Sequence, residues 1–109
     1  MANTTNTRPV PESRIYDVEL GTVLGRRSGQ LKLQLSGGRL FGILGLMNAE
    51  NPVHGRVSPD GACRLAGSIR TRISAYSFDG EGIMLSERIE MLLRCKGVSL
   101  PLRGIRREE

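Results

Sequence analysis

The chain has few of the residues that usually carry chemistry. It holds two cysteines, one histidine and no tryptophan, with only two Phe and two Tyr. Two cysteines are too few for a disulfide framework. The soft ligands Cys63, Cys95 and His54 lack the paired spacing of a metal site. We therefore expect no metal or cofactor, free buried thiols, and a core of Leu, Ile, Val and Met.

Long apolar runs are also missing. The longest, Leu40 to Met47, has eight residues including two glycines, whereas a membrane-spanning helix needs about 20. Residues 1–13 are polar, contain Pro9 and Pro11, and lack the apolar run of a signal peptide. We expect no membrane association and a cytoplasmic location, with residues 1–13 as a disordered arm.

A catalytic constellation is not visible either. His54 has no nucleophile signature near it, and Asp17, Asp60 and Asp79 fall in different segments. Asp60 and Asp79 are each followed by glycine, which is typical of turns. General acid–base catalysis needs titratable side chains positioned together, and none can be identified here, so we do not expect an enzyme.

What the chain does have is glycine and alternation. Its 14 glycines punctuate short segments in which apolar and polar residues alternate, such as Tyr16 to Leu20 and Gln30 to Leu35. This pattern predicts an all-β protein, an antiparallel meander of six to eight strands closed or half-closed into a small barrel, with at most one short helix. At 109 residues it forms one domain over residues 14–105, followed by a charged tail at 106–109.

Turns are expected where small and polar residues cluster. We expect turns at 26–29, 36–38 and 58–61, and a loop at 48–52. Between these, residues 63–75 read as one long strand. Its inward face would include Cys63, Leu65, Ile69 and Ile73, and its outward face would carry arginines.

Two local features bear on the shape of the sheet. Residues 86–97 fit a helix capped by Ser86 and Gly97, or a strand in which Ile89, Met91 and Leu93 face inward, and the neighbouring strands favour the strand. A Leu-x-Gly pattern occurs at 40–42, 65–67 and 102–104. Glycine after a core leucine on the same face lets a neighbouring strand cross closely, which favours a curved barrel.

The basic residues are 14 Arg and only 2 Lys, and the net charge is +5. Arginine holds phosphate or carboxylate in a planar fork, and a positive surface attracts polyanions. We select five arginines as a candidate polyanion-binding set and expect nucleic acid or another polyanion as a possible partner. The set is Arg26, Arg27, Arg64, Arg70 and Arg72.

Two short segments resemble known nucleotide-binding families. Residues 34–44, followed by Met47-Asn48, resemble the first motif of Sm-like RNA-binding proteins, and residues 102–104 resemble the second. That resemblance implies that Asn48 and Arg103 help to hold a base and a phosphate. Separately, residues 58–62 resemble the Ser-x-x-Gly part of PilZ domains, with Arg26-Arg27 in place of the family's basic arm. This second resemblance implies binding of a cyclic dinucleotide.

These observations lead to two functional expectations. The first is a non-catalytic binding or assembly module that self-associates. Residues 40–47 are apolar on both faces, whereas a strand of a small barrel normally exposes one face to solvent, so a second subunit would cover the other apolar face. The second is a nucleic-acid or nucleotide-binding barrel that uses an arginine-rich face.

Overall fold

The computed structural model describes residues 12–46 and 48–107, and every regular element in them is a β-strand. The alternating sequence accounts for this, because successive side chains of a strand point to opposite faces. The strands are β1 (Glu12–Thr22), β2 (Gly25–Ser36), β3 (Arg39–Leu46), β4 (Ala49–Val57), β5 (Ala62–Arg70), β6 (Ala75–Met84), β7 (Arg88–Cys95) and β8 (Val98–Arg106).

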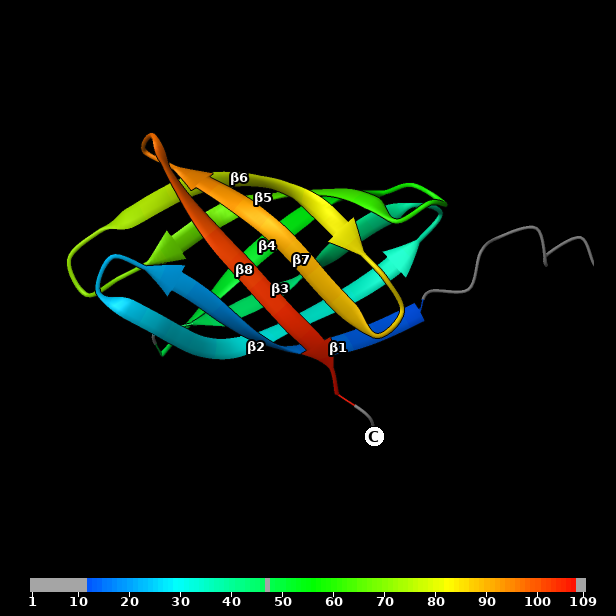
Figure 1. The fold of residues 1–109 in the computed structure, drawn as a ribbon, viewed down its shortest axis with the longest axis horizontal. Helices are drawn as coiled ribbons and strands as arrows, with labels where there is room; N and C mark the ends of the chain where they lie inside the picture. The colour runs from blue at the N-terminus through cyan, green and yellow to red at the C-terminus, as the bar shows by residue number, and fades with distance from the viewer. Residues whose placement is uncertain (1–11, 47, 108–109) are drawn as a thin grey trace, which may run out of the picture.

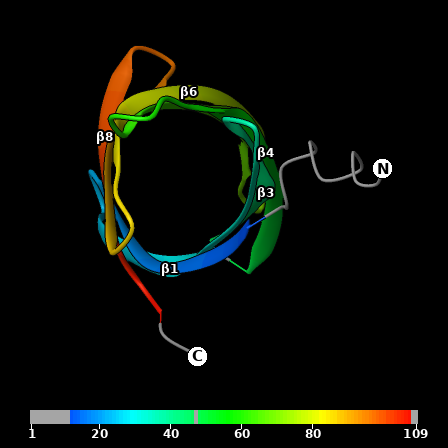
Figure 2. The ribbon, with the colours of Figure 1, turned by 90° about the vertical axis from the view of Figure 1, so that its right-hand side faces the viewer.

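The strands form a closed antiparallel barrel. Each strand pairs with the next along the chain, and β8 returns to pair with β1. Figure 1 shows the tilted strands, and the view in Figure 2 shows the closed outline, with β8 across the barrel from β3 and β4. The predicted all-β meander is therefore confirmed, with eight strands and full closure.

Apolar side chains fill the interior. An eight-stranded barrel is just wide enough for side chains to pack across it, and leucines from most of the strands do so here. Tyr16 is fully buried, and its hydroxyl donates a hydrogen bond to the carbonyl oxygen of Leu85 at 2.8 Å. The fully or nearly fully buried set includes Leu20, Leu31, Leu33, Leu40, Leu44, Leu65, Ile89, Leu93 and Leu102.

Glycines allow neighbouring strands to approach closely, as the Leu-x-Gly pattern predicted. A Cβ atom on Gly42 would lie 1.9 Å from the carbonyl oxygen of Lys32. A Cβ on Gly67 would lie 2.6 Å from the carbonyl oxygen of Pro52, and one on Gly104 would be 2.6 Å from a methyl carbon of Val18. These positions let the strands coil tightly around a small core.

Two of the expected connections are wrong. Residues 26–29 lie within β2, not in a turn, because the chain reverses earlier, where the Thr22 hydroxyl donates to the Gly25 carbonyl oxygen at 2.6 Å. Most of the expected loop at 48–52 belongs to β4, which begins at Ala49 after a tight turn. Asn48 occupies that turn with a φ of 60°, a conformation that asparagine tolerates better than most residues.

The long strand predicted over residues 63–75 is also wrong at its end. β5 ends at Arg70, and the amide of Thr71 donates to the carbonyl oxygen of Ser74 at 2.7 Å to close a turn. Ile73 is therefore 89 % exposed at the tip of the hairpin, whereas Ile69 is 4 % exposed in the core. The hydroxyl of Thr71 accepts two backbone hydrogen bonds here, which stabilises the turn against further extension of the strand.

The ambiguous segment at 86–97 is a strand, as favoured from its neighbours. β7 spans Arg88–Cys95 and pairs with β6 and β8, with Ile89, Met91 and Leu93 buried. Most of the predicted disordered arm and half of the predicted charged tail fall on residues 1–11 and 108–109, which lie outside the described residues. β1 begins at Glu12, and β8 continues to Arg106.

Candidate polyanion-binding surface

Three arginines lie side by side on the outer wall of the barrel. Arg39 of β3 is the direct cross-strand partner of Arg56 on β4, and Arg56 is the partner of Arg64 on β5. All three side chains are exposed, and neighbouring strands in a sheet are about 4.8 Å apart. We call Arg39, Arg56 and Arg64 the arginine row.

The arginine row is not neutralised by acids within residues 12–46 and 48–107. None of its members forms an ion pair there. By contrast, Arg26 lies 3.6 Å from Glu19, and Arg94 lies 3.1 Å from Glu81. Like charges directly opposite each other in a sheet destabilise it, so this row carries a local electrostatic cost.

Two hollows flank the arginine row, and Arg56 and Arg64 line both. One hollow, of about 370 Å³, continues past His54 and Ala66 toward Asp79. The other, of about 630 Å³, continues toward the β2–β3 and β4–β5 turns, where Gly37, Gly38, Ser58 and Ala62 line it. A ligand lying on the row therefore has concave surface on both sides.

Two planar rings lie next to the arginine row. Phe41 follows Arg39 by two residues on β3, and its direct cross-strand partner is His54, two residues before Arg56 on β4. Phe41 is 51 % exposed, and His54 is also exposed. Arg39, Phe41, His54 and Arg56 thus occupy four neighbouring outward-facing positions on β3 and β4.

Acidic side chains bound the positive surface on one side. Glu81 is the cross-strand partner of Arg64, and Asp79 is the partner of Ala66. In the β4–β5 turn, hydrogen bonds from the Ser58 hydroxyl and the Ala62 amide lower the pKa of Asp60. The positive potential is therefore concentrated over β3, β4 and β5.

Of the five arginines selected from sequence, the structure places only Arg64 in this row. Arg70 is the last residue of β5, and Arg72 lies in the turn that follows. Arg26 and Arg27 lie on β2, where Arg26 faces Glu19. The five do not form a continuous basic face.

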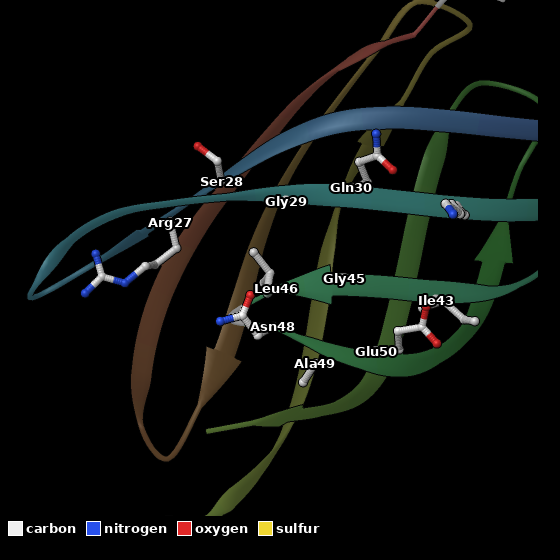
Figure 3. Close-up of a pocket in the computed structure, with 11 residues that line it drawn as sticks. Arg27, Ser28, Gly29, Gln30, Ile43, Gly45, Leu46, Asn48, Ala49 and Glu50 are labelled. Carbon is white, nitrogen blue, oxygen red and sulfur yellow. The ribbon is translucent and has the colours of Figure 1, made fainter. Parts of the chain in front are cut away.

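Arg27 lines a separate hollow, shown in Figure 3. This hollow has a volume of about 690 Å³ and runs along β2, β3 and the start of β4. Gly45 contributes no side chain to it, and Lys32 and Glu50 bring charges of opposite sign. Its lining residues include no arginines aligned across neighbouring strands, so the arginine row is the stronger candidate for a polyanion.

The segments that resemble known families occupy separate places. Asn48 lies in the hollow of Figure 3, whereas Arg103 lies in a hollow over β8 and β1. Residues 58–61 form the β4–β5 turn, in which the Gly61 amide donates to the Ser58 carbonyl oxygen at 2.9 Å, and Ala62 begins β5. This turn borders the arginine row, while Arg26 and Arg27 do not.

The sequence reading missed Arg39 and Arg56 as members of one site. Their pairing follows from strand register, which the tight turn at Asn48 sets, and the expectation of a loop at 48–52 concealed that register. An asparagine able to adopt positive φ between two alternating segments was the available signal.

Among the described residues, no helix is long and apolar enough to cross a membrane. The same part of the chain contains no group of three or more His, Cys, Asp or Glu side chains that could hold a metal ion.

Comparison with known proteins provides no assignment. No protein-family model matches the sequence, and no curated protein matches it either.

Proposed function

We propose that this barrel is a non-catalytic binding module whose arginine row holds a polyanion. The observation that carries the proposal is the direct cross-strand alignment of Arg39, Arg56 and Arg64, none of which forms an ion pair within the described residues. Guanidinium groups bind phosphate or sulfate oxygens through paired hydrogen bonds. A bound polyanion would also relieve the repulsion among the three charges.

Binding of labelled heparin tests this proposal. Fluorescence anisotropy should detect binding at low salt, and the affinity should fall steeply between about 50 and about 200 mM salt, because bound cations are released from the polyanion. Arg56→Gln should weaken binding about fivefold or more, equivalent to about 1 kcal/mol.

Arg103→Gln is the matched control. It removes the same charge from the outer wall of β8, across the barrel from β4 (Figure 2). An equal loss in both variants would mean that net charge alone drives binding. Absence of heparin binding at low salt would reject the proposal.

A second candidate is self-association through the outer face of β3. Phe41 is 51 % exposed and Ile43 is 37 % exposed. β7 is a barrel strand and is separated from β3 by other strands, so it does not cover this face. Because full closure leaves no free strand edge, copies would associate through side chains. Light scattering at high concentration should give a dimer mass that Ile43→Lys reduces to a monomer, whereas a monomeric wild-type chain would reject this candidate.

A cytoplasmic location fits both candidates. Cys63 and Cys95 are free thiols, as is usual in a reducing compartment.

A further inference from the structure

The rings beside the arginine row suggest which kind of polyanion it binds. Two of the three arginines have a ring two residues away on the same outer face: Phe41 next to Arg39, and His54 next to Arg56. Residues spaced by two on a strand are about 6.7 Å apart. The arginine row therefore runs across the strands, and the pair Phe41 and His54 lies parallel to it, two residues away along β3 and β4.

Phe41 is an unusual outer-wall residue. The chain has only two Phe, and the other, Phe78, is 4 % exposed in the core. Half of Phe41 remains open to solvent, although an exposed phenyl ring gains nothing from packing on that side. A flat apolar ring next to cations is the arrangement that holds a base by stacking while its phosphate is neutralised.

Charge limits the extent of this surface. Glu81 on β6 is the cross-strand partner of Arg64, the last member of the arginine row. Asp79 on β6 is the partner of Ala66, which lies on β5 next to His54. Glu81 forms an ion pair with Arg94 at 3.1 Å, and Arg94 is the cross-strand partner of Asp79, so the row of unpaired arginines ends at β5. The arginine row is therefore about 10 Å wide at the usual strand spacing.

We propose that the polyanion is a single-stranded nucleic acid. Its phosphates lie on Arg39, Arg56 and Arg64, and its bases stack on Phe41 and His54. This inference rests on the proposed polyanion-binding function. A duplex does not satisfy the site, because its base faces are covered by their neighbours in the stack, whereas a single strand can turn them outward.

Two probes with the same backbone separate stacking from charge. One is a labelled oligothymidylate of about 12 nucleotides, and the other is an abasic oligomer of equal length. Oligothymidylate should bind about fivefold or more tightly than the abasic oligomer, since stacking contributes that much per base. The slope of log affinity against log salt should be about −2, for three phosphate contacts on a single strand.

Variants at Phe41 and Arg56 then separate the two proposals. Phe41→Leu should reduce the advantage of oligothymidylate over the abasic oligomer, because only His54 then remains for stacking, and Phe41→Tyr should retain it. Arg56→Gln should weaken both probes. Since Phe41 is an outer-wall residue, circular dichroism and melting temperature should be unchanged in both Phe41 variants.

Each contrary outcome has a distinct meaning. Equal affinity for both probes, insensitive to Phe41→Leu but weakened by Arg56→Gln, would overturn the stacking inference and leave polyanion binding intact. Tighter binding of a duplex of the same length would also overturn it. A change of molar mass in Phe41→Leu without a change in oligonucleotide affinity would assign the ring to contacts between copies. Failure of both probes and of heparin would overturn both proposals.

Discussion

Asn51 is a polar side chain inside an apolar barrel, and it is 1 % exposed. Its Nδ2 donates to the carbonyl oxygen of Leu44 at 2.8 Å, and its Oδ1 accepts from the amide of Arg70 at 2.9 Å. It thereby satisfies backbone groups of β3 and β5. We expect Asn51→Ala to cost about 1–3 kcal/mol in urea unfolding, because both groups lose their partner in the core.

Gln34→Ala provides the comparison for Asn51. Gln34 is exposed on β2, and its loss should change stability by no more than about 0.5 kcal/mol. Similar losses in the two variants would contradict the structural role of the Asn51 amide.

Cys63 should make the stability of the fold sensitive to alkaline pH. Burial raises the pKa of the Cys63 thiol to about 11, whereas an exposed thiol titrates near 8.5. The folded state therefore keeps its proton where the unfolded chain loses it. This contribution to stability is complete below about pH 8.5 and is lost as pH rises toward about 11.

The Cys63→Val variant isolates that effect. Urea unfolding across this alkaline range should show a steeper loss of stability in the wild-type chain than in Cys63→Val, which has no ionisable group at this position. Parallel curves would show that Cys63 does not ionise on unfolding as expected.

At the scale of the strand, two glycines of β3 should respond differently to the same substitution. A Cβ on Gly42 would lie 1.9 Å from the carbonyl oxygen of Lys32, so β2 must move to admit it. On Gly45 the nearest atom, the carbonyl oxygen of Gln30, would be 3.7 Å away. We expect Gly42→Ala to cost about 1–3 kcal/mol or more and Gly45→Ala about 0.5 kcal/mol or less. Equal melting temperatures would contradict the close approach of β2 and β3.

The end of β5 gives a second comparison within one segment. Ile69 lies in the core and Ile73 at the hairpin tip, at 4 % and 89 % exposure. Ile69→Ala should cost about 2–5 kcal/mol through the cavity it leaves. Ile73→Ala should change stability by about 0.5 kcal/mol or less. Destabilisation by both variants would instead place Ile73 in the core beside Ile69, as the alternation of residues 63–75 first indicated.

For the molecule as a whole, the charges behind the net charge of +5 are unevenly distributed. Removing one arginine should therefore raise or lower the melting temperature according to the charges beside it. Arg56 faces two arginines, whereas Arg103 faces Glu19 and Glu90 across its strand pairs. At low salt, Arg56→Gln should therefore raise the melting temperature, and Arg103→Gln should lower it. Both differences should shrink in about 1 M salt, where the Debye length is about 3 Å. A change of melting temperature in the same direction for both variants would contradict these assignments of neighbouring charges.

The sequence predicts the barrel well because the relevant signal is local. Alternation within each segment, such as Gln30 to Leu35, identifies strands and their buried faces without knowledge of their partners. The arginine row is different, since it depends on three strands being in register. The turn at Asn48 determines that register, and a misplaced loop of a few residues hid the pairing of Arg39 with Arg56. Arg70 and Arg72 lie at the end of β5 and in the turn after it, away from the three-strand register that forms the arginine row.

Closure of the barrel has a consequence for biosynthesis. β1 pairs with β8 from Tyr16–Arg106 to Leu20–Leu102, so the ring cannot close until β8 has been translated. At about 5–20 residues per second, the partners of β1 emerge roughly 4–18 s after β1 itself. During that interval the nascent sheet presents two open edges to other chains. Slower production and lower temperature should therefore increase the soluble yield.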